Sequence, residues 1–279
     1  MVDVNGEKMH VYSEGSGDRT IVMLSGLGTG SPVVDFSPLI KELGQSYKVV
    51  VVENFGYGWS DITKKPRTVQ NIVEETRLAL REAGIKPPYI LMPHSISGIY
   101  SLYYANSYPD EIEGVIGIDT SVPAQITLLS PSIGMSPVLA LGASTGLIRI
   151  VTKVDPSRVM SADEASAYTD EQFKLLRLMY CWHAYNTSVI NETNHVYENI
   201  EAVQGMKYPE SIPVLFFLAQ SSADLFGNMG MDWVSVHKEL ISDNEQSKCI
   251  VLEGPHYLHR PNSIRMADET EQFLKPAQP

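Results

Sequence analysis

The stretch from Tyr89 to Asn106 decides the fold and reads Y-I-L-M-P-H-S-I-S-G-I-Y-S-L-Y-Y-A-N. An apolar run ends at a cluster of small, turn-forming residues, and apolar side chains then recur at helical spacing at Ile99, Leu102 and Tyr103. This pattern predicts a strand, a sharp turn and a helix. Ser95 falls at the apex of the turn, where its hydroxyl would stand above the sheet beside the unpaired N–H groups of the helix N-terminus. Ser95 is therefore the candidate nucleophile.

The turn matches the G-x-S-x-G pattern of a nucleophile elbow only in a relaxed form, because Pro93 and Ser97 stand at the two small-residue positions. Small residues are needed there because the strand and the helix nearly touch. Ser97 satisfies that need, whereas Pro93 adds bulk and lacks an N–H. An ordinary turn with a buried serine is the alternative, and other segments must decide between the two.

The composition is that of a soluble globular protein. A chain of 279 residues, 43% of them hydrophobic and 19% charged, fits one large domain, or one domain with an insertion, better than two equal domains. The 33 acidic and 21 basic residues give a net charge of −12, and the basic residues form no cluster. This excludes an electrostatic fit to nucleic acid or to an anionic membrane surface.

The two cysteines indicate a reducing compartment. Cys181 and Cys249 lie in apolar contexts without metal-ligand spacing, so we expect two free buried thiols. No apolar run reaches the roughly 18 residues that span a bilayer, and no signal-peptide pattern opens the chain. We therefore expect a cytoplasmic protein without stable membrane insertion, and an anchored or exported protein if a segment precedes this sequence.

Strands and helices alternate along most of the chain, which predicts an α/β fold with a doubly wound, mostly parallel sheet. The pattern at 8–13 alternates as an edge strand would, and the runs at 20–26 and 47–54 are too apolar for solvent-facing strands, as in a buried parallel sheet. The expected strands are 8–13, 20–26, 47–54, 89–92, 114–119, 212–219 and 247–254, and the expected helices are 36–43, 68–84, 233–240 and 263–274.

The rhythm changes between residues 124 and 210, where no strand pattern occurs and one long helix is expected from Asp163 to Tyr185. We interpret 124–210 as an inserted helical cap, and 1–123 with 211–279 as the core domain. An insertion between these strands should lie above their carboxyl ends, where ligands bind in such sheets. Candidate substrate-binding residues on its inner face are Met135, Tyr180 and Trp182.

A serine hydroxyl needs a base, and the fold should deliver that base from the loop after the last strand. The segment L-E-G-P-H-Y-L-H (252–259) offers His256 directly after the strand end, and His259 as second choice. His94, beside the nucleophile, is expected to pack or to orient the turn.

The acid is expected after the strand at 212–219, where the loop Q-S-S-A-D-L-F-G offers Asp224. Asp119, at the end of the strand that follows the elbow helix, is the alternative. At that position we expect a structural role in capping loop amides.

Two backbone N–H groups should bind the oxyanion, those of Ile96 and of Leu27 in the loop S-G-L-G-T-G (25–30). The glycines of this loop let the backbone approach a substrate. G-L-G-T-G lacks the G-x-G-x-x-G spacing of a dinucleotide site, and no metal-ligand pattern accompanies it. We expect no cofactor and no metal.

Four segments in order resemble the α/β-hydrolase family. S-G-L-G (25–28) stands where the family has His-Gly, and E-N-F-G-Y-G-W-S-D (53–61) is similar to its Asp-x-x-Gly-x-Gly-x-Ser loop. P-H-S-I-S-G (93–98) resembles its Gly-His-Ser-x-Gly-Gly elbow, and G-P-H (254–256) its Gly-His loop. The resemblance covers the chain outside 122–210 and implies a hydrolase. The departures at the four segments are Ser25, Glu53, Pro93 and Pro255.

The nucleophile narrows the expected chemistry. The family's dehalogenases and epoxide hydrolases use an aspartate at the elbow, so Ser95 favours a serine hydrolase acting on a carboxylic ester, lactone, thioester or amide. The apolar cap sequence favours a small, largely uncharged, hydrophobic substrate. A hydroxynitrile-lyase-type enzyme and a hydrolase-fold ligand receptor or signalling protein stay open as alternatives.

Overall fold

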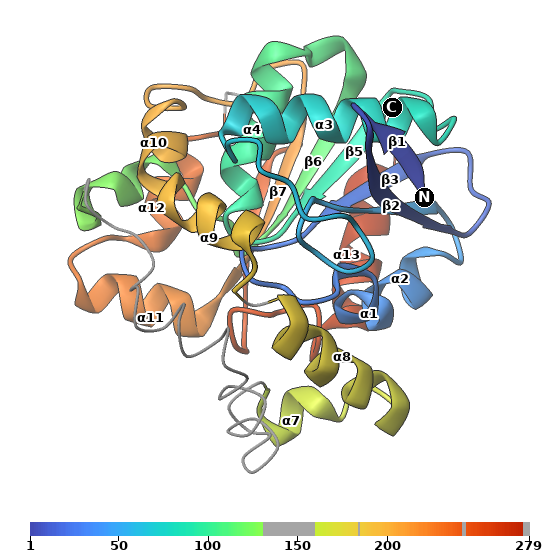
Figure 1. The fold of residues 1–279 in the computed structure, drawn as a ribbon. Helices are drawn as coiled ribbons and strands as arrows, with labels where there is room; N and C mark the ends of the chain where they lie inside the picture. Colours follow the sequence, from blue (N-terminus) through green and yellow to red (C-terminus); the bar gives the residue numbers. More distant parts are fainter. Residues whose placement is uncertain (131–159, 184, 242–243, 276–279) are drawn as a thin grey trace.

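The computed structural model describes residues 1–130, 160–183, 185–241 and 244–275. Its centre is an eight-stranded sheet in the order β1-β2-β4-β3-β5-β6-β7-β8 (Figure 1). The pairs β1–β2 and β2–β4 are antiparallel, and all other neighbours are parallel. The strands are β1 (Val2–Val4), β2 (Glu7–Glu14), β3 (Thr20–Leu24), β4 (Lys48–Glu53), β5 (Tyr89–Pro93), β6 (Ile112–Ile118), β7 (Val214–Ala219) and β8 (Lys248–Leu252). This is the mostly parallel α/β sheet that the sequence predicts.

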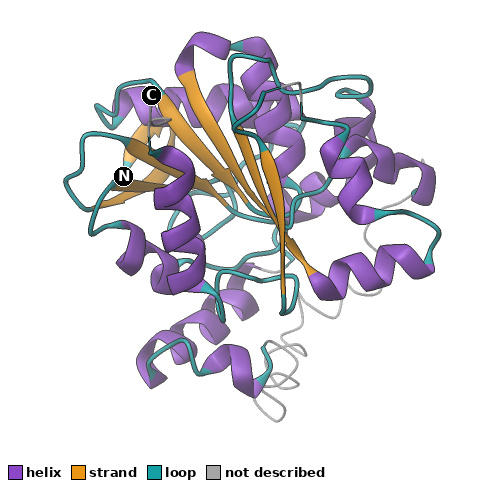
Figure 2. Cartoon of the chain, turned by 180° about the vertical axis from the view of Figure 1, so that it is seen from behind, coloured by secondary structure: helices purple, strands orange, loops and turns teal. Residues whose placement is uncertain are grey.

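Helices cover both faces of the sheet (Figures 1 and 2). The helices and helical turns are α1 (Pro32–Asp35), α2 (Ser37–Leu43), α3 (Val69–Glu82), α4 (Ser97–Ser107), η1 (Pro109–Glu111), η2 (Pro123–Leu128), α7 (Ala162–Ala165), α8 (Asp170–His183), α9 (Thr187–Asn194), α10 (Val196–Glu201), α11 (Gln220–Asn228), α12 (Trp233–Lys238) and α13 (Ser263–Leu274). Residues of α3, α4 and α12 belong to one large apolar core cluster, and residues of α2 and α13 belong to a second; a smaller third cluster contains Met160, Tyr168 and Leu176.

The central strands β3 and β5 are almost entirely apolar because both of their faces are covered. All five residues of β3 and all five of β5 are buried, and side chains alternate between the two core clusters along each strand. Val22 and Leu91 pack on the α3–α4 side, whereas Ile21 and Ile90 pack on the α2–α13 side. This double burial holds the carboxyl end of β5 rigidly, and the elbow begins there.

Local signals set the limits of α3. Thr68 precedes it in an extended conformation and its hydroxyl accepts a hydrogen bond from the Asn71 N–H at 3.4 Å. At the other end Gly84 has φ +70°, a conformation that stops a helix and suits glycine. The sequence placed both ends of this helix within one or two residues.

Two details differ from the sequence-based prediction. The edge strand is β1, so the prediction that residues 8–13 form the edge is wrong: β2 pairs on both sides. The long helix expected from Asp163 to Tyr185 is two helices, α7 and α8. The chain turns between them at Tyr168, whose side chain is buried and whose hydroxyl donates to the Asp35 carbonyl at 2.6 Å.

Helices α7 to α10 lie between β6 and β7 in the sequence. In Figure 1, α7 and α8 lie below the sheet, on the side where the chain leaves β7 and enters α11. That is the side of the strand carboxyl ends. The division into a core and a cap with boundaries at 123/124 and 210/211 stays a prediction, and part of the 124–210 segment lies outside the described residues.

Candidate active site

Ser95 occupies a strained turn between β5 and α4. Its φ is +56°, in the left-handed region that a residue with a side chain rarely adopts. Hydrogen bonds on both sides hold the turn: the Ser95 N–H donates to the Ile118 carbonyl at 3.2 Å, and the Ser95 carbonyl accepts from the Ser121 N–H at 2.8 Å. The strain is therefore supported by the neighbouring strand β6 and the loop that follows it.

Close packing explains the small residues around the turn. A Cβ atom on Gly26 would lie 2.8 Å from the Ser95 Cβ, and one on Gly98 would lie 2.5 Å from the Thr120 Cβ. Ser97 replaces the second small residue of the elbow pattern, and its hydroxyl donates to the Ser25 carbonyl at 2.6 Å. The departure from the pattern thus ties the elbow to the glycine-rich loop instead of loosening it.

His256 lies between Ser95 and a carboxylate. Its Nε2 is 2.9 Å from the Ser95 Oγ, and its Nδ1 is 2.6 Å from the Asp119 Oδ2. The imidazole side chain is 43% exposed while the Asp119 side chain is fully buried, so the row of groups runs from the interior outward. The structure thus brings together the expected nucleophile and the expected base, and the carboxylate that contacts the imidazole is that of Asp119.

Asp119 is held by four hydrogen-bond donors. Besides His256, its carboxylate accepts from the Ser222 Oγ at 2.5 Å, the Trp233 Nε1 at 3.0 Å and the Ala219 N–H at 3.0 Å. Burial raises the pKa of Asp119, but the hydrogen bond and charge of His256, with the hydrogen bonds from Ser222 and Ala219, outweigh it and leave the pKa below its usual value. The carboxylate is therefore ionised at neutral pH and can stabilise a cationic imidazole.

The prediction that Asp224 contacts His256 is wrong. Its side chain is exposed, and its Oδ1 accepts a hydrogen bond from the Gln220 Nε2 at 2.7 Å. The reason is that β7 passes directly into α11, so Asp224 lies on a helix and not on the expected loop. From α11 it is Ser222 that reaches the site, as a donor to Asp119.

A sequence signal for Asp119 did exist. It directly follows the apolar run of β6, the strand next to the one that ends at the elbow. The structure adds that its φ is +41°, which turns the chain at the carboxyl edge of the sheet. Choosing it over Asp224 required knowing that the chain after β7 is helical.

His94 contacts the backbone of His256. Its Nε2 is 3.2 Å from the His256 carbonyl oxygen, so the ring nitrogen that carries the proton faces the loop of His256. Burial, with the neighbouring His256 and His259, lowers the pKa of His94, which keeps the ring neutral. The expected orienting role agrees with these contacts.

His259 belongs to a separate buried ion cluster. Its Nε2 is 2.8 Å from the Asp35 Oδ2, and Arg260 donates to the Asp35 Oδ1 from Nη2 at 2.7 Å and from Nε at 3.1 Å. Arg260 also pairs with Glu164 of α7 at 2.7 Å and lies over the Tyr257 ring at 3.7 Å. This cluster links the loop after β8 to α1 and to the inserted helices.

Replacing Asp35 with asparagine should lower the free energy of unfolding by about 3 kcal/mol, because it leaves the buried Arg260 charge with less compensation. Burial raises the pKa of Asp35, but Arg260 and His259 lower it further, so the folded value lies below the unfolded one. The stabilisation is then present above about pH 4 and lost as the pH falls below it.

Urea denaturation at neutral and acid pH measures this effect. The difference between Asp35→Asn and the wild type should shrink as the pH falls, and Asp110→Asn, at an exposed position, is the matched control. A difference that does not change with pH, or equal losses in both variants, would contradict this account.

The two backbone groups expected to bind an oxyanion flank Ser95. Ile96 directly precedes α4, and Leu27 follows Gly26, which packs on the Ser95 side chain. Among the described residues, neither the Leu27 nor the Ile96 N–H has a hydrogen-bond acceptor. Both groups are thus available to a bound oxygen atom.

Of the three candidate substrate-binding residues, Tyr180 lies beside the glycine-rich loop. A Cβ on Gly30, in the glycine-rich loop, would lie 2.5 Å from the Tyr180 backbone nitrogen. Trp182 is 59% exposed and stacks on the His183 ring with a centroid distance of 5.1 Å. Met135 lies outside the described residues.

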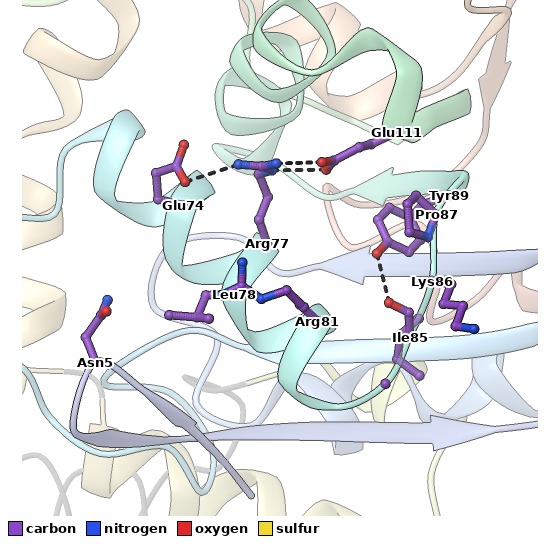
Figure 3. Close-up of a pocket in the computed structure, with 11 residues that line it drawn as sticks. Asn5, Glu74, Arg77, Leu78, Arg81, Ile85, Lys86, Pro87, Tyr89 and Glu111 are labelled. Carbon is purple, nitrogen blue, oxygen red and sulfur yellow. Dashed lines mark hydrogen bonds and ion pairs between the residues drawn. The ribbon is translucent and has the colours of Figure 1, made fainter.

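A cavity of about 540 Å³ lies elsewhere, between α3, the turn after it and the start of β5 (Figure 3). Tyr89 lines it, whereas Ser95 follows the other end of the same strand, so this cavity is not the site of the triad. Arg77 at its edge is paired with Glu111 at 2.5 Å.

Within the described ranges, no group of three His, Cys, Asp or Glu side chains could hold a metal ion. In the same part of the chain, no helix is long and apolar enough to cross a bilayer.

The chain is similar in sequence to a protein family and to a bacterial protein. Residues 19–142 match the family model described as alpha/beta hydrolase fold. The chain is 32% identical over 272 residues to the uncharacterized protein YbdG of Bacillus subtilis (strain 168), covering 95% of this chain and 82% of that protein.

Solved structures share the fold at low identity. The epoxide hydrolase VrEH1 from Vigna radiata superposes with a TM-score of 0.73 at 17% identity, over 98% of this chain and 96% of that one. The enol-lactonase from Burkholderia xenovorans LB400 superposes with a TM-score of 0.63 at 18% identity, over 97% of this chain and 98% of that one.

Proposed function

This chain belongs to the α/β-hydrolase fold family and is a hydrolase, and from that premise we propose that it is a serine hydrolase that cleaves carboxylic esters, with lactones, thioesters and amides as related substrates. The observation that carries the proposal is the row Ser95–His256–Asp119, with spacings of 2.9 and 2.6 Å. These are the contacts that acyl transfer to a serine requires.

The first half of the reaction acylates Ser95. His256 Nε2 takes the hydroxyl proton as Oγ attacks the substrate carbonyl carbon, and Asp119 stabilises the imidazolium that forms. The carbonyl oxygen becomes an oxyanion, and the N–H groups of Leu27 and Ile96 donate to it. His256 then gives the proton to the leaving alkoxide, and an acyl-enzyme ester on Ser95 remains.

The second half repeats these steps with water. His256 takes a proton from the water as it attacks the acyl carbon, the same two N–H groups hold the second oxyanion, and the proton returns to Ser95 Oγ as the acid product leaves. His256 is 43% exposed, so water reaches the base without a further opening of the protein.

The nucleophile supports ester over epoxide chemistry. An epoxide hydrolase with a covalent intermediate needs a carboxylate at the elbow, because hydrolysis of the intermediate requires an ester carbonyl, whereas attack by Ser95 would leave an ether. One of the proteins with the same fold is named an enol-lactonase, and a lactone is a cyclic ester. We propose a small, largely uncharged, hydrophobic substrate, with Tyr180 beside the glycine-rich loop as a contact.

A fluorophosphonate probe tests the proposal directly. Incubation with the wild-type protein should give one phosphonyl adduct per chain, and peptide mass spectrometry should locate it on Ser95, because only a serine activated by a neighbouring base reacts quickly. Ser95→Ala should remain unlabelled under the same conditions. Labelling of another serine, or none, would overturn the assignment.

Measurements of substrate turnover then distinguish a serine hydrolase from the two alternatives, a hydroxynitrile-lyase-type enzyme and a ligand receptor. A serine hydrolase should both react with the probe and release p-nitrophenol from short-chain p-nitrophenyl esters. A lyase of the hydroxynitrile type would instead release cyanide from a cyanohydrin, and a ligand receptor would show labelling without turnover of either substrate.

A further inference from the structure

A buried carboxylate stands outside the row of reacting groups. Glu192, on α9, is 2% exposed, and its two oxygens accept hydrogen bonds of 2.8 Å from the hydroxyls of Tyr57 and Tyr100. Burial raises the pKa of Glu192, and the charge of Arg67 opposes that effect. Burying a carboxylate in this way is costly, and a hydrophobic side chain would fill the same space more cheaply.

One arm of this contact reaches the glycine-rich loop. Tyr57 has a single hydroxyl proton, which it donates to Glu192, so a lone pair of the same oxygen is free to accept from the Gly28 N–H at 3.3 Å. Gly28 directly follows Leu27 and has φ +81°. The hydroxyl of Tyr57 therefore fixes the orientation of the peptide next to one oxyanion donor.

The other arm reaches the elbow helix. Tyr100 lies on α4, the helix that Ile96 directly precedes, and its hydroxyl donates to the second oxygen of Glu192. Tyr57 and Tyr100 are both 2% exposed, so neither hydroxyl has water as an alternative partner. Glu192 thus joins the loop that carries the Leu27 N–H to the helix that begins beside the Ile96 N–H.

We propose that Tyr57 and Glu192 are positioning residues that set the distance between the two donors of the oxyanion hole. The inference rests on the proposed serine hydrolase function. Two donors stabilise one oxygen only if both come within about 2.7–3.1 Å of it. A small relative movement of the loop and the helix therefore weakens the binding of the transition state more than the binding of the substrate. A carboxylate that accepts two hydroxyls at once makes such a link, and a hydrophobic side chain would not.

Two variants cut the link in different places. Tyr57→Phe removes the hydroxyl that holds the Gly28 N–H, and Glu192→Gln leaves one acceptor oxygen for two hydroxyl donors. The matched control is Tyr104→Phe, which removes a hydrogen bond of 2.9 Å between a buried tyrosine of the same helix and the partly exposed Glu111, without touching the loop.

For p-nitrophenyl butyrate, Tyr57→Phe and Glu192→Gln should lower kcat about 10- to 100-fold with KM nearly unchanged, which is less than the loss of a whole donor. The affinity for a trifluoromethyl ketone that forms a tetrahedral adduct with Ser95 should fall by the same factor as kcat. Tyr104→Phe should change both by less than about twofold. The inference is wrong if the two link variants keep the wild-type kcat. It is also wrong if both KM and kcat change in these variants and change equally in the control.

Hydrogen exchange tests the link apart from activity. In the absence of substrate, the backbone amides of a peptide covering residues 25–30 should exchange faster in Tyr57→Phe and Glu192→Gln than in the wild type. Their exchange rate in Tyr104→Phe should equal that of the wild type. Faster exchange in a protein that shows no ester turnover would support the link and reject the proposed function. Unchanged exchange in the two variants would reject the link itself.

Discussion

Ser95→Ala should lower kcat for p-nitrophenyl ester hydrolysis about 10⁴- to 10⁶-fold, because no other described serine lies in hydrogen-bond contact with His256. KM should change little, since the alanine removes only the attacking atom. The turn itself should survive, because the backbone bonds of residue 95 to Ile118 and Ser121 do not involve the hydroxyl.

The matched control is Ser97→Ala, two residues away. Its hydroxyl donates to the Ser25 carbonyl and not to His256, so its loss should cost less than about tenfold through a looser oxyanion loop. Rates are compared at equal folded concentration, checked by thermal denaturation. Turnover that persists in Ser95→Ala above the uncatalysed rate by more than about 10⁴-fold would mean that another nucleophile is present.

Asp119→Asn should lower kcat about 10⁴-fold, whereas Asp224→Asn should leave it within about twofold. Asparagine keeps the size of the side chain but removes the charge that stabilises the imidazolium, and its amide group can hold His256 in the wrong tautomer. Asp224 is exposed and bonds only to Gln220 among the described contacts, so its charge is screened by water.

This pair of variants decides which acid the enzyme uses. Asp119→Asn can still accept hydrogen bonds from Trp233 and the Ala219 N–H through its remaining oxygen, so the fold should hold. Circular dichroism and thermal denaturation check that point. If Asp224→Asn proves the more damaging change, the row of groups in the structure is not the one that works in solution.

The location of the acid also explains why Trp233 and Ser222 are buried around it. Each donates a hydrogen bond to Asp119, and Trp233 in turn packs on Phe226 at 4.0 Å and on His237 at 4.5 Å between ring centroids. The helices after β7 therefore act on the site through the carboxylate that they surround. The Asp224 carboxylate of α11 accepts a hydrogen bond from Gln220 of the same helix.

The sequence by itself predicted the mostly parallel sheet, the position of the elbow and the histidine that contacts Ser95. The apolar strands read as buried because both faces are covered, and the pattern of strand, small residues and helix located Ser95 at its turn. These are local signals, each contained in fewer than about twenty residues, and local signals are what periodicity and turn chemistry report. The choice of His256 over His259 followed from its distance to the strand end, and the contact with Ser95 agrees with it.

Only the tertiary structure decided which carboxylate meets that histidine and what the other polar groups do. Asp119 and His256 are 137 residues apart and meet because β6 and β8 both lie beside β7, so that the residues following their carboxyl ends come together at one edge of the sheet. The pairing of His259 with Asp35, and of Glu192 with Tyr57, likewise depends on contacts between distant segments. A side chain buried with its partner leaves the same letter in a sequence as one exposed to water, because its partner is set by the packing of whole elements and not by its neighbours in the chain.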